Sequence, residues 1–293
     1  MTFTTHSVTV PDGRLTVGEW AGGDRPVLAI HGLSSSHKLW LWTAAHLEGC
    51  RLVAPDLRGR GASQGLKPHH GIEVHRDDMV AILDHFGIEK TTVVGMSLGG
   101  FIAVRLAASH PERVERLLLV DGGVPFMNTA AMRAMTREQV AGVFRDRFGR
   151  IERSWPSLEE YRDFFVSATG PLLKKDDPLL EEYLRYDLVG SAPELEVRLD
   201  AAAMTDDALD LFLDDRAERA ADSIQAPTHM LFAEWATGAG TPPAYRADYL
   251  EPWAKKIPSF QATLLPGTDH AATVMQPSSG AAIAGEINAL ATL

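Results

Sequence analysis

The sequence predicts an α/β fold in which a mostly parallel sheet carries helices on both faces, with a helical cap inserted in the middle of the chain. Short apolar runs bounded by Gly, Pro or Asp alternate with helical patterns over about the first 120 residues. Residues 124–222 then lack strand-like runs and are rich in Arg, Asp, Glu, Ala and Leu, and the strand pattern returns after them. We therefore expect residues 1–123 and 223–293 to form the core and 124–222 the cap.

Composition narrows the class of protein. The 293 residues are 45% apolar and 23% charged, which suits a folded chain with a sizeable core. The net charge of −11 argues against a nucleic-acid partner, because phosphate binding needs clustered Lys and Arg. The N-terminal residues lack a signal-peptide pattern, and no apolar run approaches the roughly 20 residues of a membrane helix. Because Cys50 is the single cysteine, no intrachain disulfide can form, so we expect a cytoplasmic protein. The sequence leaves its oligomeric state open.

The first half of the chain reads as an edge hairpin followed by strand–helix units. Ser7–Val10 and Leu15–Trp20 flank the turn residues Pro11-Asp12-Gly13, which predicts an antiparallel hairpin. Apolar residues at helical spacing predict a helix from Ile72 to Phe86 with Gly87 as its stop, and a second helix over Phe101–Ser109. Buried strands are predicted at Val27–Ile30, Arg51–Ala54, Thr91–Val94 and Arg116–Val120.

The second half reads as the cap and then the end of the sheet. Helical stretches are predicted over Arg137–Phe148 and Leu158–Val166. Strands are predicted at Thr228–Phe232 and Phe260–Leu265, and a final amphipathic helix over Ser279–Leu290.

A glycine-framed serine stands between a predicted strand and a predicted helix. Gly95-Met96-Ser97-Leu98-Gly99 fits the Gly-x-Ser-x-Gly pattern of a nucleophile on a sharp turn. The turn is so tight that its flanking positions have no room for a side chain. Alone the motif is weak evidence, because an ordinary Gly-rich connection also fits it; a phosphate-binding loop is disfavoured because the Walker lysine is absent.

Two further motifs accompany this turn. His31-Gly32-Leu33 follows the strand at Val27–Ile30, and the segment from Asp56 to Ser63 (Asp-Leu-Arg-Gly-Arg-Gly-Ala-Ser) follows the next strand. With these motifs in this order, the sequence resembles the α/β-hydrolase superfamily over nearly its whole length. The resemblance implies that Ser97 is the nucleophile and that the backbone N–H groups of Leu33 and Leu98 form the oxyanion hole. It also implies that His31 shapes the loop and does not react.

A serine nucleophile needs a base and an acid that orients the base. His270 follows the last predicted strand, where the family places its catalytic histidine. Most relatives carry the acid after the strand at Thr228–Phe232, but this chain has no Asp there and offers Glu234 instead. Asp121 ends the strand Arg116–Val120, where some family members keep their acid. Asp121 is the favoured acid, Glu234 the alternative and Asp269 a weaker third.

These residues predict a serine hydrolase that forms an acyl-enzyme on Ser97. The proposed substrate is a small carboxylic ester or lactone, because Ser at this position disfavours the family branches that use an Asp nucleophile. The apolar and aromatic candidate pocket residues favour a hydrophobic substrate over a charged one. The alternatives are a C–C hydrolase of ring-cleavage products, a cofactor-free haloperoxidase or perhydrolase, and a non-catalytic ligand-binding relative. We expect no cofactor and no metal; the histidines, including His69 and His70 in a polar loop, lack metal-ligand spacing. The candidate substrate-binding residues are Gly32, Leu33, Met96, Trp155, Phe164, Phe165, Tyr183, Tyr186 and Trp235.

Overall fold

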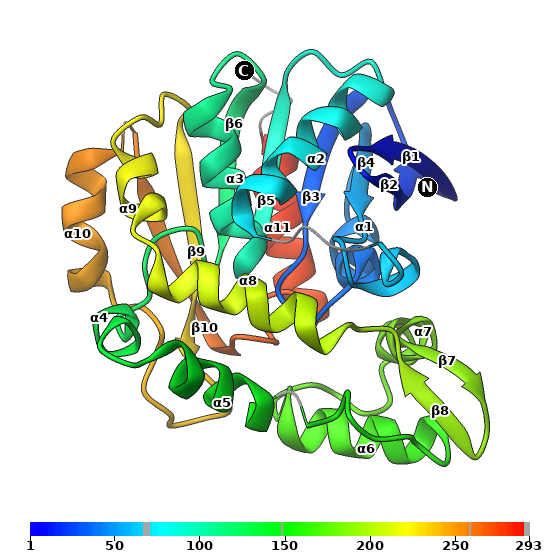
Figure 1. Ribbon diagram of the computed structural model, residues 1–293. Helices are drawn as coiled ribbons and strands as arrows, with labels where there is room; N and C mark the ends of the chain where they lie inside the picture. Colours follow the sequence, from blue (N-terminus) through cyan, green and yellow to red (C-terminus); the bar gives the residue numbers. More distant parts are fainter. Residues whose placement is uncertain (67–70, 148, 258, 290–293) are drawn as a thin grey trace.

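An eight-stranded sheet in the order β1-β2-β4-β3-β5-β6-β9-β10 forms the centre of the computed structural model, which describes residues 1–66, 71–147, 149–257 and 259–289 (Figure 1). β1 and β2 form an antiparallel hairpin, β2 runs antiparallel to β4, and the remaining neighbours are parallel. The strands are β1 Thr2–Val10, β2 Gly13–Ala21, β3 Arg25–Ile30, β4 Cys50–Pro55, β5 Thr91–Met96, β6 Val114–Val120, β9 Thr228–Trp235 and β10 Gln261–Asp269.

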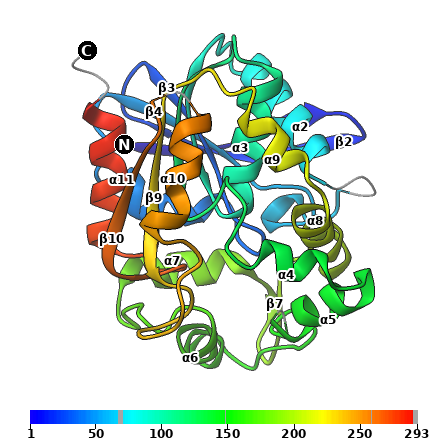
Figure 2. The ribbon, with the colours of Figure 1, turned by 90° about the vertical axis from the view of Figure 1, so that its left-hand side faces the viewer.

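Helices cover both faces of this sheet. α2 (Ile72–His85) and α3 (Leu98–Ser109) lie on one side, and α11 (Pro277–Ala289) lies on the other side, as Figure 2 shows. Because both faces are covered, the inner parallel strands are apolar along their length and do not alternate. All six residues of β5 are buried. Two further helices of the core are α1 Leu41–Ala44 and α10 Ala247–Lys256.

The predicted strands and the mostly parallel sheet are confirmed, with changes at the strand ends. β9 continues to Trp235, three residues beyond the predicted end at Phe232. β10 continues to Asp269 through an irregularity after Leu265. The two strands therefore pair beyond the C-terminal ends that the apolar pattern predicted for them. The predicted helix ends Phe148 and Leu290, and also His69 and His70, lie outside the described residues.

Most of the segment between β6 and β9 lies at the carboxyl ends of the parallel strands (Figure 1), and its last helix packs against α3 on the way back to the start of β9. It contains α4 Thr129–Arg133, α5 Arg137–Arg147, α6 Leu158–Ala168, α7 Pro178–Asp187, α8 Ala201–Leu213 and α9 Arg216–Ala221. It also contains a two-stranded hairpin of β7 (Leu188–Ser191) and β8 (Glu194–Val197). The expectation that residues 124–222 hold no strands was therefore wrong. These strands are only four residues long and largely exposed, so they leave no apolar run in the sequence.

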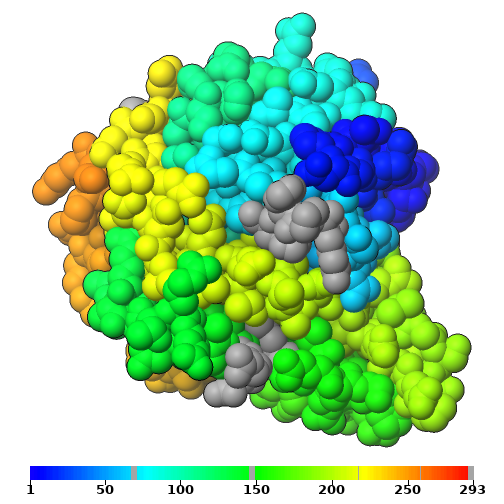
Figure 3. Space-filling model, in the orientation of Figure 1, coloured from blue at the N-terminus to red at the C-terminus, as the bar shows by residue number. Residues whose placement is uncertain are grey.

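We call residues 124–222 the insertion. The green and yellow-green atoms of most of it form the lower part of the molecule in Figure 3. None of the described helices is both long enough and apolar enough to span a bilayer.

Candidate active site

Ser97 stands on the turn between β5 and α3 in a conformation that side chains rarely adopt. Its φ is 53° and its ψ is −120°, which costs about 1–3 kcal/mol of backbone strain. A Cβ atom on Gly95 would lie 2.3 Å from the carbonyl oxygen of Gly99, and one on Gly99 would lie 2.0 Å from the carbonyl oxygen of Ile30. Both flanking positions therefore require glycine, as the motif predicts.

Asp121 follows β6 directly beside this turn. The Ser97 N–H donates to the carbonyl oxygen of Val120 at 3.0 Å. A Cβ on Gly122 would lie 2.5 Å from the Cα of Ser97, so the two turns are in backbone contact. Asp121 also has a positive φ, 45°. Two adjacent strands thus each end in a strained residue at the same edge of the sheet.

His270 meets the Asp121 carboxylate. Its Nδ1 lies 2.5 Å from Asp121 Oδ2, while Asp121 Oδ1 accepts the Ala233 N–H at 3.0 Å. Asp121 is fully buried and the His270 side chain is 27% exposed. An ionised carboxylate only accepts hydrogen bonds, so the proton of a neutral imidazole sits on Nδ1 and Nε2 keeps its lone pair. This imidazole can therefore accept a proton at Nε2.

The other two carboxylates considered from the sequence bind backbone groups around His270. Glu234 Oε2 accepts the Gly267 N–H at 2.8 Å. Asp269 accepts the Gly238 N–H at 2.8 Å and the Ala272 N–H at 2.9 Å. Both side chains fix the segment that carries His270, whereas the His270 ring itself contacts Asp121.

The segment His31-Gly32-Leu33 lies against Ser97. A Cβ on Gly32 would stand 3.2 Å from Ser97 Cβ and 3.0 Å from Met96 Sδ. This brings the Leu33 backbone to the serine turn. Leu98 begins α3, and the first N–H groups of a helix have no partner within that helix. The structure therefore brings the two predicted oxyanion donors to the neighbourhood of Ser97.

His31 is enclosed and both ring nitrogens are engaged. Nε2 accepts the Leu57 N–H at 3.0 Å, and Nδ1 lies 2.7 Å from the carbonyl oxygen of Gly32. Burial lowers the pKa of His31 to about 3, so the ring is neutral. With its acceptor nitrogen occupied, it is a structural link between the loops after β3 and β4.

Asp56 organises the motif that follows β4. Its carboxylate accepts the N–H and Nδ1–H of His37, both at 2.8 Å, and the Ala62 N–H at 2.9 Å. Burial raises the pKa of Asp56, but His37 and the hydroxyl of Tyr186 outweigh burial and hold it below the usual range. A Cβ on Gly61 would meet Asp56 Oδ2 at 2.3 Å, which explains this glycine.

Three of the six aromatic residues proposed for substrate binding have their side-chain polar atoms in contacts within the protein. The Tyr186 hydroxyl donates to Asp56 Oδ2 at 2.5 Å, and the Tyr183 hydroxyl lies 3.0 Å from Ser35 Oγ. The Trp155 N–H donates to a backbone carbonyl at 3.1 Å. Phe164 and Phe165 belong to the same aromatic cluster, with Phe164 5.0 Å from Trp155 between ring centroids and Phe165 5.8 Å from Tyr183. Trp235 is half-buried at the end of β9. Their role at the substrate stays a prediction.

Sequence reasoning missed the charged residues that join the insertion to the loops beside Ser97. These are Arg60, Arg150, Asp187 and Asp207, and all four are buried. Arg60 of the core pairs with Asp207 of the insertion. Arg150 pairs with Asp187 inside the insertion and reaches the core through the Ser34 carbonyl oxygen. Their partners lie far apart in sequence, and neither Arg150 nor the two aspartates belong to a recognisable motif. Among the described residues, no group of three or more His, Cys, Asp or Glu side chains is arranged to hold a metal ion.

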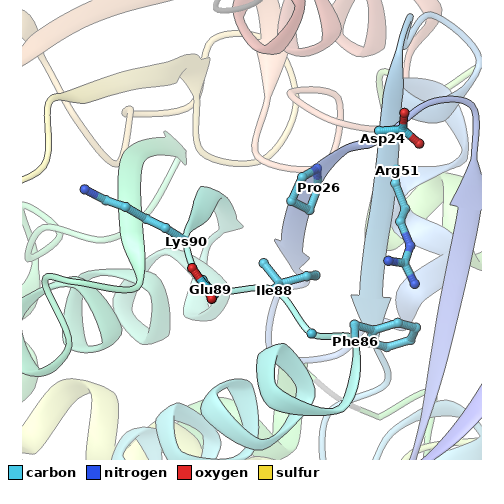
Figure 4. A pocket seen from close by; sticks show the side chains of 8 residues that line it. Asp24, Pro26, Arg51, Phe86, Ile88, Glu89 and Lys90 are labelled. Carbon is cyan, nitrogen blue, oxygen red and sulfur yellow. The ribbon is translucent and has the colours of Figure 1, made fainter.

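A cavity of about 440 Å³ lies at the amino ends of the parallel strands, opposite the ends that carry Ser97 and Asp121. It is lined by Asp24, Arg51, Phe86 and Lys90, among others (Figure 4). Lys90 precedes β5 and Ser97 follows it. Six strand residues at about 3.3 Å each separate the two ends by roughly 20 Å. This cavity is therefore distinct from the serine site.

Comparison with known proteins agrees with this geometry. The alpha/beta hydrolase fold family matches residues 25–155. The chain is 38% identical over 102 residues to Lipase LipV of Mycobacterium tuberculosis, covering 35% of this chain and 39% of that protein. It is 36% identical over 121 residues to 2-hydroxymuconate semialdehyde hydrolase of a Pseudomonas strain, covering 39% and 43%. The chain thus matches less than half the length of these curated relatives.

Among solved structures, that of E-2-(acetamidomethylene)succinate hydrolase aligns over 100% of both chains with a TM-score of 0.81 and 19% identity, a likeness that concerns the fold. The strand order, the glycine-framed Ser97 turn and the family match over residues 25–155 agree, and the chain has the alpha/beta hydrolase fold.

Proposed function

We propose that this protein is a serine hydrolase that cleaves a hydrophobic carboxylic ester or lactone through an acyl-enzyme on Ser97. The observation that carries the proposal is the 2.5 Å contact between His270 Nδ1 and the buried Asp121, beside the strained serine turn. The carboxylate orients the imidazole with Nε2 free to accept a proton, which is the arrangement that activates a serine.

The reaction would proceed in two halves. His270 Nε2 takes the proton from the Ser97 hydroxyl as the oxygen attacks the carbonyl carbon. The tetrahedral oxyanion is held by the N–H groups of Leu33 and Leu98. Collapse breaks the bond to the alcohol oxygen, which leaves with the proton from His270. Water then attacks the acyl-enzyme with His270 again as base, and the acid is released from Ser97.

The insertion is proposed to cap this site and to determine which substrates enter. Most of it lies at the carboxyl ends of the strands (Figure 1). Ser97 directly follows β5 and Asp121 directly follows β6 at these ends. A lid over this edge excludes water and shapes the acyl and alcohol pockets. The apolar character of Met96, Leu33 and the aromatic cluster supports a hydrophobic substrate.

The direct test is Ser97→Ala measured against a chain-length series of nitrophenyl esters and a panel of lactones. We expect the variant to lose at least about 10³-fold in kcat while keeping the fold, because the nucleophile is gone. A fluorophosphonate probe should label the wild type and not the variant. Unchanged hydrolysis by Ser97→Ala would overturn the proposal.

The similarity to 2-hydroxymuconate semialdehyde hydrolase supports a second candidate, hydrolysis of a C–C bond. The same base and acid would serve that reaction. Turnover of a vinylogous diketone faster than any ester or lactone in the panel would favour it.

A further inference from the structure

Three consecutive residues of the loop beside Ser97 are each bound by a different polar side chain. The Leu33 carbonyl oxygen accepts from Arg60 Nε at 2.9 Å, and the Ser34 carbonyl oxygen accepts from Arg150 Nη2 at 2.6 Å. Ser35 Oγ lies 3.0 Å from the Tyr183 hydroxyl. This loop carries the Leu33 N–H, so its backbone position sets where that donor points.

All three polar groups depend on the insertion. Arg150 and Tyr183 belong to it. Arg60 lies in the loop after β4, but its Nη1 pairs with Asp207 of α8 at 2.6 Å. Arg150 Nη1 pairs with Asp187, at the end of α7, at 2.7 Å. In each arginine, Nη1 therefore pairs with a carboxylate of the insertion, and a second guanidinium nitrogen donates to a carbonyl oxygen of the loop 33–35.

Burial makes these contacts rigid. Arg60 and Asp207 are 0% exposed, and Arg150 and Asp187 are 2% and 1% exposed. Burial raises the pKa of Asp207, but His75 and Arg60 outweigh burial and hold it below the usual range, so the carboxylate is ionised at neutral pH. A planar guanidinium held by a buried carboxylate has little freedom to turn away from its second acceptor.

From these contacts we propose that Arg60, Arg150 and Tyr183 are positioning residues that hold the loop 33–35, and thereby the oxyanion-binding N–H of Leu33, against the seated insertion. The insertion would then control kcat as well as substrate entry. This inference rests on the proposed function, because it assigns the clamped N–H a part in that reaction. A donor displaced from the oxyanion loses much of its effect, since such stabilisation depends on pre-organised geometry.

The test compares Arg150→Lys with Arg133→Lys. Arg150→Lys keeps a positive charge opposite the Asp187 carboxylate. A lysine has one side-chain nitrogen, so it cannot reproduce the guanidinium geometry that also donates to the Ser34 carbonyl oxygen. Arg133 is the control with the same kinds of partner at a more exposed position, because it joins a carboxylate, Glu218 at 3.0 Å, and a backbone carbonyl, that of Asp214 at 2.7 Å. Tyr183→Phe is a milder second variant that removes one hydroxyl and keeps the ring.

We expect Arg150→Lys to lower kcat on a nitrophenyl ester by about tenfold with KM changed by less than about threefold. An aryl boronic acid, whose adduct with Ser97 presents an anionic oxygen, should lose affinity by a similar factor. Amide hydrogen exchange in a peptide covering residues 31–40 should become faster. Tyr183→Phe should shift these quantities in the same direction, and Arg133→Lys should shift them by less than about twofold.

The outcomes separate the two proposals. Equal exchange of residues 31–40 in Arg150→Lys and Arg133→Lys overturns the clamp, whatever the activity. Faster exchange with unchanged kcat and boronate affinity overturns its part in the reaction. A wild type that hydrolyses no ester or lactone and binds no boronate refutes the proposed function, while the exchange comparison still decides the clamp.

Discussion

Ser97 and Asp121 are two non-glycine residues with positive φ, 53° and 45°, at the ends of neighbouring parallel strands. Each conformation costs about 1–3 kcal/mol and persists only where the surroundings enforce it. Here the enforcing contacts are the glycines around the serine turn and the hydrogen bonds to Asp121. Both strained residues belong to the proposed reaction centre, whose geometry they supply.

The first residue-scale prediction concerns the acid. Asp121→Asn should lower kcat by about 10³–10⁴-fold with little change in the fold, because an amide no longer fixes the His270 tautomer. Glu234→Gln should stay within about tenfold, since its carboxylate contacts the backbone of Gly267 and an amide oxygen can still accept that bond. Steady-state kinetics on one ester measures both. The reverse ranking would assign the acid to Glu234.

The second residue-scale prediction concerns His31. Because burial lowers its pKa from 6.5 to about 3, the unfolded chain binds more protons between these values, and stability falls as the pH falls. This one group should remove about 2 kcal/mol of unfolding free energy between pH 7 and pH 5. His31→Gln should show a correspondingly flatter profile in urea unfolding. A profile parallel to the wild type would contradict this account.

At the scale of elements, the contact between β3 and α3 depends on the absence of a side chain at Gly99. Gly99→Ala would place a Cβ 2.0 Å from the carbonyl oxygen of Ile30, a backbone atom that cannot move aside without shifting the strand. We expect Gly99→Ala to lower the unfolding free energy by about 1–3 kcal/mol. Thermal and urea unfolding would measure it.

Gly142 in α5 is the matched control, because nothing lies within 4 Å of a Cβ built there. Gly142→Ala should be neutral or stabilise the protein by up to about 1 kcal/mol, since alanine favours helix. If both substitutions lowered the unfolding free energy equally, the steric contact between a side chain at position 99 and the Ile30 backbone would not be the cause.

At the scale of the whole molecule, the insertion is joined to the core by buried and exposed ion pairs. Asp207→Asn leaves the buried Arg60 without its counter-charge, which should cost about 3–5 kcal/mol of unfolding free energy. Glu182→Gln removes a half-exposed partner of Lys38, which should cost less than about 1 kcal/mol.

Urea unfolding followed by fluorescence compares these two variants directly. Limited proteolysis adds a second readout, because a loosened insertion should be cut within residues 124–222 before the core. If both substitutions cost the same, the insertion is not held mainly through its buried pairs.

The sequence by itself determined the class of fold and supplied the hypothesis for the chemistry of the candidate centre. Buried parallel strands are continuous apolar runs, and a tight turn admits only glycine beside its serine, so both are visible in a single sequence. The short exposed strands β7 and β8 carry no such pattern and were missed.

The tertiary structure alone decided which side chains meet. Asp121 and His270 are 149 residues apart, and the sequence favoured Asp121 but left Glu234 and Asp269 as further candidates. Which carboxylate reaches the ring depends on strand register and on the path of the chain after β9. The same holds for Arg60 with Asp207 and Arg150 with Ser34: a hydrogen bond between distant segments has no local signature, because only the packed fold brings its two atoms together.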